Sequence, residues 1–243
     1  MRDPSFDLTA KAILDRFDPG LARKRPPDRP FMVELFGTTN SGKTSVMDKL
    51  YMAFKSAGFE TAKVPEGAEA VPPPRILPVY NFMTADYAIE HARRYALDRN
   101  LHLVLFDRAI CDAAVRMELF VRDGKMGPEE CDTFQAYYMS RWNRSLFDLH
   151  VCLVTSVEVG LIRKYGVDHA ARAKYSTSTN PESMSKALEA HEYVWNAHEW
   201  AENGNVLWVD TSSLSIDQAA ETVKNAMAQA FLQRLDRLHS TTP

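Results

Sequence analysis

The stretch FMVELFGTTNSGKTSVMDKL, residues 31–50, joins an apolar run to an amphipathic segment through a short loop of small residues. Its centre, Gly37–Thr44, matches the pattern G-x-x-x-x-G-K-[ST], with a strand-like run before it and a helix-like run after it. Glycine adopts backbone angles that other residues resist. A flexible loop between a buried strand and a helix is the usual place for a bound phosphate, so this stretch predicts a nucleoside triphosphate site.

The loop offers such a ligand a ring of backbone donors. The amides of residues 39–44 can point inward at the N-terminus of the following helix, which makes a concave anion site. Lys43 would reach the β- and γ-phosphates, and the Thr44 hydroxyl would ligate Mg²⁺. We therefore predict ATP and Mg²⁺ as cofactors. The residues expected to contact the nucleotide are Gly37, Thr38, Thr39, Asn40, Ser41, Gly42, Lys43, Thr44 and Ser45.

The composition is that of an ordinary soluble protein. The chain has 243 residues with a formal net charge of −3, which fits one large domain and does not favour a nucleic-acid partner. No apolar run approaches the roughly 18 residues needed to span a bilayer, and the N-terminus does not resemble a secretory signal. Cys111, Cys131 and Cys152 lack the spacing of a metal site or a disulfide framework. We expect reduced thiols in a cytoplasmic protein.

Residues 1–30 are interpreted as an N-terminal arm or linker. The segment PGLARKRPPDRP mixes prolines and a glycine with basic residues, and this composition cannot continue a helix. From residue 31 the pattern changes, and a single domain is expected over residues 31–243.

Within that domain, apolar strand-like runs alternate with helical stretches. Such alternation implies a parallel sheet covered on both faces, so the predicted fold is an α/β domain of three layers, α/β/α, around a five-stranded parallel sheet. The expected strands are 31–36, 59–64, 101–106, 149–154 and 206–210. The expected helices are 43–56, 84–98, 109–123, 128–146, a stretch from about 184 to 198, and a last one that begins with the capping box Ser215–Gln218.

A second acidic residue ends the third strand-like run. Asp107 follows LHLVLF and precedes Arg108. An acid at this place can contact Mg²⁺ through water or act as a base toward an acceptor hydroxyl. The bidentate guanidinium of Arg108 suits a phosphate. The alternative is structural, in which Asp107 caps a helix beginning at Ala109 and pairs with Arg108.

The residues Phe106-Asp107-Arg108, the strand before them and Asp112 after them resemble a segment of the P-loop nucleoside and nucleotide kinases. That group includes thymidylate kinases, deoxynucleoside kinases and nicotinamide riboside kinase-like domains. The resemblance spans residues 31–210. It implies ATP- and Mg²⁺-dependent phosphoryl transfer to a hydroxyl or phosphate of a small molecule, with a nucleoside or nucleotide favoured, and the strand order 2-3-1-4-5. Dimers are common in the group, so a homodimer is an open expectation.

The helix before the third strand resembles a further motif. Thymidylate kinases carry an F-x-x-A-D-R-like run there, and Phe82, Ala85 and Asp86 match it. Tyr87 stands where the family has a phosphate-contacting arginine, which counts against a monophosphate acceptor. Phe82, Asp86, Tyr87 and Glu90 could line the acceptor pocket, although a packing role is favoured for each of them alone.

Glu66 follows the second strand, within VPEGA. In kinases of this group a carboxylate at this position faces the acceptor and orients or deprotonates its hydroxyl. Glu66 would then have to lie within about 3 Å of the attacking oxygen. An exposed glutamate in a turn is an equally weighted alternative. Glu66 and Asp107 are therefore rival candidates for the base.

Residues 160–180 form the candidate lid. Basic residues predominate in this segment, and its place in the chain resembles the lid of these kinases. A closing lid excludes water, and positioned cations stabilise a phosphoryl group in transfer. Arg163 and Arg172 are the predicted contacts to the γ-phosphate. The alternative is a mobile, soluble basic loop.

Other P-loop functions have signatures that this sequence lacks. A GTPase would want N-K-x-D for guanine, and no such tetrapeptide occurs. Motor-type ATPases more often place a second acid after the first, where this chain has Arg108. A P-loop ATPase or a nucleotide-sensing regulatory protein without kinase activity stays the alternative. The basic segment Arg23–Arg29 is a weak hint of a polynucleotide acceptor.

Overall fold

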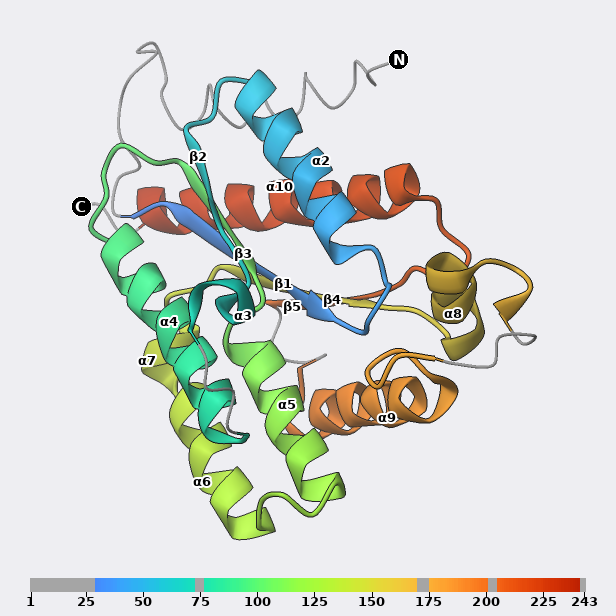
Figure 1. Ribbon diagram of the computed structural model, residues 1–243. Coiled ribbons are helices and arrows are strands. Elements are labelled where there is room, and N and C mark those ends of the chain that lie inside the picture. Colours follow the sequence, from blue (N-terminus) through green and yellow to red (C-terminus); the bar gives the residue numbers. More distant parts are fainter. Residues whose placement is uncertain (1–28, 73–76, 170–174, 201–204, 241–243) are drawn as a thin grey trace.

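The computed structural model describes residues 29–72, 77–169, 175–200 and 205–240. Strands and helices alternate along the chain, as the sequence predicts (Figure 1). The strands are β1 (Phe31–Gly37), β2 (Thr61–Val64), β3 (Leu103–Asp107), β4 (Leu149–Val154) and β5 (Val206–Asp210). The helices are α2 (Lys43–Ser56), α3 (Gly67–Ala70), α4 (Val79–Tyr95), α5 (Ile110–Arg122), α6 (Pro128–Tyr138), α7 (Arg141–Arg144), α8 (Val157–Tyr165), α9 (Pro181–Ala197) and α10 (Ile216–Ser240).

The strands form one parallel sheet in the order β2-β3-β1-β4-β5. Strand β1 lies in the centre, with Leu35 opposite Asp107 of β3 and Gly37 opposite Leu153 of β4. The predicted α/β fold and strand order are confirmed. The chain crosses from one side of β1 to the other between β3 and β4, and open sheets bind ligands at the carboxyl end of such a crossing point.

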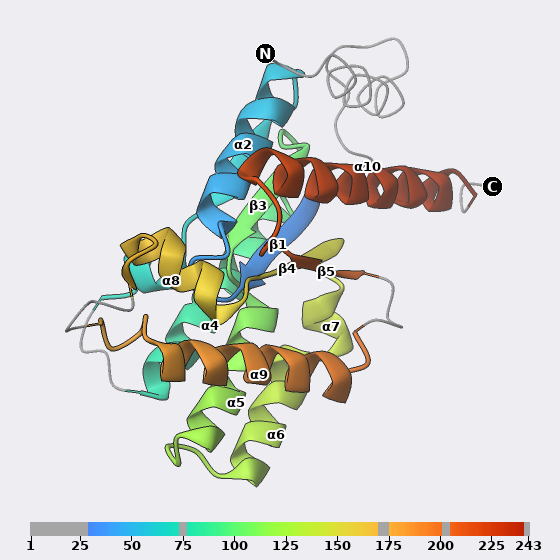
Figure 2. The same cartoon turned by 90° about the vertical axis from the view of Figure 1, so that its right-hand side faces the viewer.

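Helices cover both faces of the sheet (Figures 1 and 2). On one face, Val33 and Leu35 of β1 belong to the core shared with α2 and α10. On the other, Met32 and Phe36 belong to the core shared with α4, α5, α6 and α9. Every residue of β1 is buried, because a parallel strand covered on both faces exposes neither side. The phosphate loop therefore follows the most enclosed strand of the sheet.

Some helix boundaries differ from those expected. Helix α4 begins at Val79, not at residue 84, and proline 78 precedes it as the N-cap, a place where proline is tolerated. The helix expected over 128–146 is two helices, because Ser140 has an extended backbone with φ −56° and ψ 152°. Helix α3 occupies residues where the sequence indicates a loop.

Most of the expected N-terminal arm, residues 1–28, lies outside the described residues. Arg29 is described, and its guanidinium donates to both carboxylate oxygens of Asp148, at 2.8 and 3.0 Å. The carbonyl oxygen of Pro30 accepts a hydrogen bond from Arg234 at 3.1 Å. The chain is thus anchored to the domain just before β1 begins. No described helix is long and apolar enough to cross a membrane.

Candidate active site

The loop after β1 has the backbone angles expected of a phosphate-binding loop. Gly37 has φ 134°, and Gly42, the N-cap of α2, has φ 91°; both angles suit glycine. A Cβ atom on Gly37 would lie 1.9 Å from the carbonyl oxygen of Leu153, so no larger residue fits there. Asn40 has φ 60°, and its side chain donates to the carbonyl oxygen of Gly160 at 3.1 Å. The loop is therefore held by both β4 and α8.

Lys43 is folded back onto this loop. Its Nζ donates to the carbonyl oxygens of Thr38 at 2.7 Å and Gly37 at 3.1 Å. The residue is 7% exposed, and burial lowers its pKa to about 7, with the charge of Arg108 adding to the shift. A bound anion would favour the charged form. Contact between Lys43 and the phosphates stays a prediction.

A cavity of about 540 Å³ adjoins the loop. Residues 39–46 line it, together with Asp107 and Arg108 at the end of β3, Glu66, and Arg163 of α8. The structure thus brings the predicted nucleotide contacts from Thr39 to Ser45 to one cavity. Gly37 and Thr38 do not line it, but their carbonyl oxygens accept hydrogen bonds from Lys43.

The opposite wall of this cavity was not predicted. It consists of the turn after β5 and the first turns of α10, and it includes Thr211, Leu214 and Ile216. The Thr211 hydroxyl lies 3.0 Å from the carbonyl oxygen of Ser41, which ties this turn to the phosphate loop. The sequence signal here, a capping box, indicates only where a helix begins. Leu214 and Ile216 give this side of the cavity apolar surface.

Arg163 reaches the cavity from a helix. Its guanidinium donates to the carbonyl oxygens of Thr211 at 2.6 Å, Asn40 at 3.3 Å and Leu214 at 3.4 Å. It therefore joins the phosphate loop to the turn that precedes α10. The alternative of a basic loop does not hold for Arg163, because α8 continues to Tyr165. Its contact with a γ-phosphate stays a prediction.

The remainder of the expected lid is described only in part. Arg172, the second predicted lid arginine, lies in residues 170–174, outside the described part of the chain. Residues 175–180 lead into α9, where the Asn180 side chain accepts a hydrogen bond from the amide of Ser183 at 2.9 Å. Asn180 therefore caps α9, and the lid itself stays a prediction.

Arg108 is the centre of an ion-pair network at the carboxyl end of β3. Its Nε lies 2.9 Å from Oε1 of Glu66, and its Nη1 donates to Oδ1 of Asp112 at 2.6 Å. Although burial raises the pKa of Asp112, the charges of Arg108 and Arg116 outweigh it and lower that pKa to about 2. Burial likewise disfavours the charged Arg108, but Asp112 and Glu66 raise its pKa. Arg108 and Asp112 are therefore charged at neutral pH and fix each other in place.

Asp107 lies at the end of β3, where it is 9% exposed and lines the first cavity. Burial raises the pKa of its carboxyl group, and the charge of Arg108 partly offsets this. The structural alternative, in which Asp107 caps the next helix, is wrong, because the N-cap of α5 is Ala109. A carboxylate in the wall of a phosphate-loop cavity suits a divalent cation.

A second cavity of about 300 Å³ adjoins the first. Glu66 and Arg108 line both cavities, whereas Asp107 lines the first and not the second. The second cavity is also lined by Asn81 of α4 and Arg116 of α5. Two binding spaces therefore meet at one carboxylate and one guanidinium.

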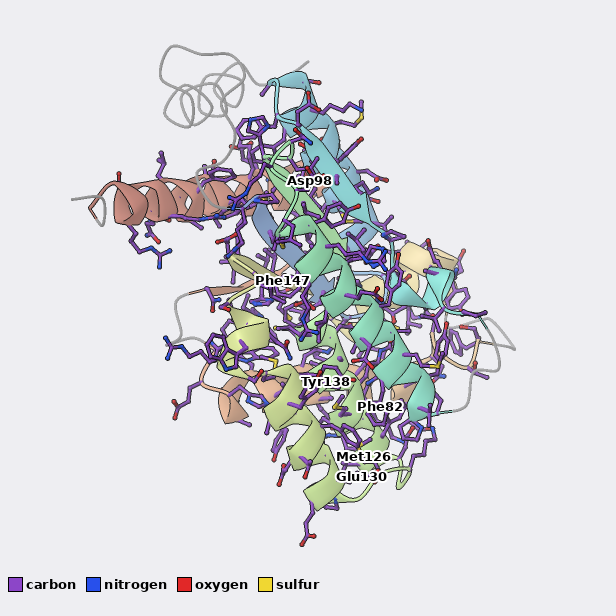
Figure 3. The ribbon with its side chains drawn as sticks, turned by 90° about the vertical axis from the view of Figure 1, so that its left-hand side faces the viewer. Phe82, Asp98, Met126, Glu130, Tyr138 and Phe147 are labelled. Carbon is purple, nitrogen blue, oxygen red and sulfur yellow. The ribbon has the colours of Figure 1, made fainter. Side chains whose placement is uncertain are left out.

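Helix α4 borders the second cavity with a different face from the one expected. Phe82 of α4 and Tyr138 of α6 lie where these two helices meet (Figure 3). Phe82 stacks on Phe134 of α6, with ring centroids 4.0 Å apart, and Asp86 accepts a hydrogen bond from the Tyr138 hydroxyl at 3.1 Å. Both residues therefore face the neighbouring helix. The residues of α4 that line the cavity are Tyr80, Asn81 and Thr84.

The other two residues expected to line the acceptor pocket make contacts along their own helix. Tyr87 lies against the ring of His91, and Glu90 pairs with Arg94. None of these four residues lines the second cavity, which agrees with the role favoured for each of them alone. The cavity-lining residues of α4 lie nearer its start, which is at Val79 and not at residue 84.

No protein-family model and no curated protein sequence matches this chain. Its structure is similar to that of deoxyadenosine kinase from M. mycoides with the products dCMP and a flexible dCDP bound, at a TM-score of 0.56 and 16% sequence identity, covering 82% of this chain and 100% of that one. A structure of the M. mycoides deoxyadenosine kinase with bound dATP gives a TM-score of 0.52 at 16% identity, covering 80% and 98%. At this identity the likeness concerns the fold. The resemblance to P-loop deoxynucleoside kinases is thus confirmed at the level of the fold.

Proposed function

We propose that this protein is a small-molecule kinase, which transfers the γ-phosphoryl group of ATP, with Mg²⁺, to a nucleoside- or nucleotide-like acceptor. The observation that carries the proposal is the meeting of two cavities at Glu66 and Arg108. Phosphoryl transfer requires the protein to hold the phosphoryl donor and the acceptor side by side and to stabilise the charge that develops between them. A hydrolase would need only the first cavity and a water molecule.

We assign the first cavity to ATP. The loop amides at the N-terminus of α2 suit the phosphates, and Leu214 and Ile216 offer apolar surface to the base. Thr44 and Asp107 line this cavity and carry the hard oxygen atoms that Mg²⁺ prefers, so they would hold the ion. When bound, the ion neutralises charge on the phosphates.

We assign Glu66 as the base and Asp107 as the metal residue. Glu66 borders both cavities and can therefore meet the hydroxyl of an acceptor in the second. The proton of that hydroxyl would pass to the Glu66 carboxylate as its oxygen bonds to phosphorus and the bond from phosphorus to ADP breaks. The carboxylate contacts of Arg108 use Nε and Nη1, and a guanidinium has five N–H donors. Donors are thus left for the group in transfer.

The second cavity limits the size of the acceptor. A volume of about 300 Å³ is at the lower end of the range for small-molecule sites. Asn81 and Arg116 supply polar groups and Phe120 supplies an aromatic ring, a combination that suits a heterocyclic compound. The nucleotides bound in the two similar structures support the same class of acceptor.

The test is a screen of acceptors by mass spectrometry. Protein, ATP and Mg²⁺ are incubated with nucleosides, nucleoside monophosphates, nicotinamide riboside, other small alcohols and a 5′-hydroxyl oligonucleotide, and Lys43→Ala serves as the control. We expect one class of small acceptor to gain a phosphoryl group with the wild type and not with the variant. Hydrolysis of ATP without any phosphorylated product would instead support a P-loop ATPase or a nucleotide-sensing protein.

A further inference from the structure

Glu34 is a carboxylate in the middle of an apolar core. It lies on β1 between Met32 and Phe36, which face the same side of the sheet, and its exposed fraction is 0%. Burial of a charged group is costly unless hydrogen-bond donors satisfy it. The neighbouring side chains of β1 are apolar and cannot donate hydrogen bonds to Glu34. The donors must therefore come from other elements of the fold.

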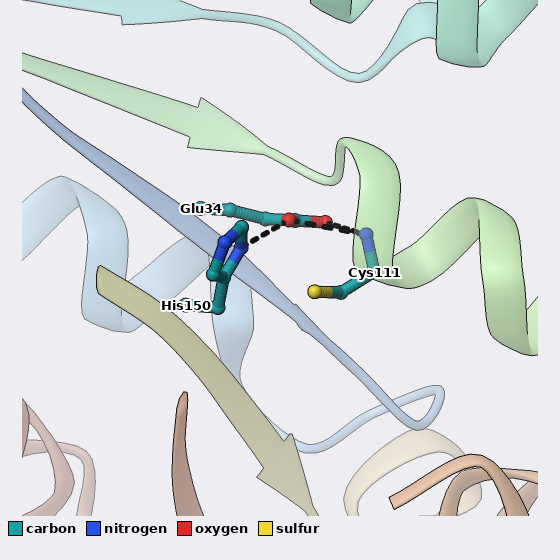
Figure 4. Close-up of side chains that lie close together, drawn as sticks. All are labelled: Glu34, Cys111 and His150. Atoms are coloured by element: carbon teal, nitrogen blue, oxygen red, sulfur yellow. Dashed lines mark hydrogen bonds and ion pairs between the residues drawn. The ribbon is translucent and has the colours of Figure 1, made fainter. Parts of the chain in front are cut away.

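Those donors are amides at the start of α5, of which Figure 4 shows that of Cys111, together with the ring of His150. Oε1 of Glu34 accepts hydrogen bonds from the amides of Ala109 at 2.7 Å, Cys111 at 3.1 Å and Asp112 at 3.1 Å. Oε2 lies 2.7 Å from Nδ1 of His150, the residue opposite on β4. The N-cap of α5 is Ala109, whose methyl side chain cannot accept a hydrogen bond. Because the first amides of a helix lack partners within it and attract negative charge, Glu34 caps α5 from the neighbouring strand.

A metal ion is the rival explanation for this cluster, since Glu34, Cys111 and His150 offer ligand atoms that lie within 4.8 Å of one another. The chemistry does not fit a cation. The oxygens of Glu34 are already engaged by N–H groups, whose positive ends would repel it. Burial raises the pKa of the Cys111 thiol well above its usual range, which disfavours the thiolate that metals bind.

The capped amides lie next to Arg108 in the chain. Arg108 has φ 65° and Ala109 has φ −153° and ψ −122°, so the backbone turns sharply between β3 and α5. Strand β1 holds both sides of this turn. The amide of Arg108 donates to the carbonyl oxygen of Leu35 at 2.9 Å, and the amide of Ala109 donates to Glu34. This turn brings Arg108 to Glu66 and Asp112.

We propose that Glu34 is a positioning residue of the phosphoryl-transfer site, which holds Arg108 and Asp112 at the junction of the two cavities through the N-terminus of α5. The effect of Glu34 on catalysis rests on the proposed kinase function, whereas its hydrogen bonds to the start of α5 do not depend on that function. Strand β1 also ends in Gly37, where the phosphate loop begins. The same strand therefore fixes the position of the phosphate loop relative to Arg108.

The test replaces Glu34 with glutamine, which keeps the shape of the side chain and exchanges one acceptor oxygen for an NH₂ group. With the acceptor found in the screen, we expect kcat to fall by about 100-fold, the effect of a small misplacement of a charge-stabilising group. The KM for ATP should change by less than about twofold, because the phosphate loop is untouched. Hydrogen exchange of amides 109–112 should become faster, and that of α2 should not.

Two further variants serve as controls. Glu118→Gln removes a carboxylate from the same helix, where it pairs with Arg122, and should leave kcat and the exchange of amides 109–112 unchanged. Cys111→Ala removes a side chain of the cluster but no amide, so it should keep the kcat of the wild type. If Cys111→Ala lowered kcat as much as Glu34→Gln, the result would favour a metal site and overturn the capping role of Glu34.

Wild-type kcat together with wild-type exchange in Glu34→Gln would also overturn the proposal. If the wild type phosphorylates no acceptor, the kinase function fails, and the exchange comparison alone decides the role of Glu34. If Glu34→Gln does not fold, hydrogen exchange of the wild type tests the capping role of Glu34. The amides of Ala109, Cys111 and Asp112 should then be protected as strongly as those of β1, and exchange at the rate of an exposed loop would contradict the cap.

Discussion

The lowered pKa of Lys43 gives a prediction about nucleotide binding at the scale of one residue. Burial, and then the charge of Arg108, lower its pKa to about 7, so at about pH 8 most of its amines are neutral. A phosphate beside it would raise that pKa. We therefore expect nucleotide binding to take up about one proton at this pH and fewer as the pH falls below 7. Calorimetric titration with a non-hydrolysable ATP analogue, in buffers of different ionisation enthalpy, measures this uptake.

The control for this titration is Lys43→Met, which removes the titrating amine and keeps a long side chain. The variant should bind the analogue more weakly and without the proton uptake. Equal uptake in the wild type and in the variant would mean that another group takes up the proton, against the lowered pKa of Lys43.

Neutralisation of Asp107 and neutralisation of Glu66 should have different effects on the reaction. Asp107→Asn should raise the Mg²⁺ concentration needed for half-maximal rate, and extra Mg²⁺ should partly restore activity, because a metal contact is lost. Glu66→Gln should lower kcat by about 100-fold or more without changing the Mg²⁺ requirement, because a base is lost. Initial rates over a Mg²⁺ series separate the two. If Mg²⁺ rescues Glu66→Gln and not Asp107→Asn, the two roles are reversed.

At the scale of single residues, the sequence was informative where a site is contiguous. The phosphate loop could be found because Gly37–Thr44 must be adjacent to form one ring of amides. The site roles of Thr211, Asn81 and Glu34 could not be predicted, because each depends on contacts with residues far away in the sequence. Asp107 could be recognised from its place after a strand, but its rival role as a helix cap could be ruled out only from the structure, where Ala109 is the N-cap of α5.

Helix α8 gives a prediction at the scale of an element, since Arg163 joins it to the phosphate loop and to the turn before α10. Arg163→Ala should weaken ATP binding by about tenfold, which corresponds to the loss of a charged hydrogen bond of about 1.5 kcal/mol. The neighbouring Lys164, which is exposed, provides the control Lys164→Ala, and this variant should bind like the wild type. Titration calorimetry measures both. Equal affinities in the two variants would remove Arg163 from the nucleotide site.

Strands were predicted best where polar residues bound an apolar run on both sides. The runs 149–154 and 206–210 match β4 and β5 to the residue, since continuous apolar stretches bounded by polar residues leave little choice. The break between α6 and α7 was missed because no glycine or proline marks Ser140. The start of α4 was missed because the prolines before it indicate a loop, although proline is tolerated at a helix start.

For the whole molecule, binding of nucleotide should stabilise the fold. At an ATP concentration of about 100 times its dissociation constant, the stabilisation is about 2.7 kcal/mol. For a chain of this size, each kcal/mol shifts Tm by about 2–4 °C, so we expect a rise of about 5–11 °C in thermal unfolding with ATP and Mg²⁺. Lys43→Ala should show a much smaller rise at the same concentration. Identical Tm values with and without ATP, in the wild type, would mean that the first cavity takes another ligand.

At this scale the layered architecture followed from the alternation of strands and helices alone, because parallel strands need a crossover element between them. The order of the strands followed from the family resemblance and not from spacing. The junction of the two cavities could not be predicted, because it needs β2, β3, α4 and α8 in place at once. The proposed function rests on that junction more than on any single motif.

The most direct test of transfer across the Glu66–Arg108 junction is to follow the γ-phosphoryl group of ATP, labelled at that position. The wild type is incubated with Mg²⁺ and the pooled acceptors, and the labelled products are separated. We expect the label in an organic phosphate, and no such product with Lys43→Ala. Label found only in inorganic phosphate or unreacted ATP, with every class of acceptor present, would contradict phosphoryl transfer to a small molecule.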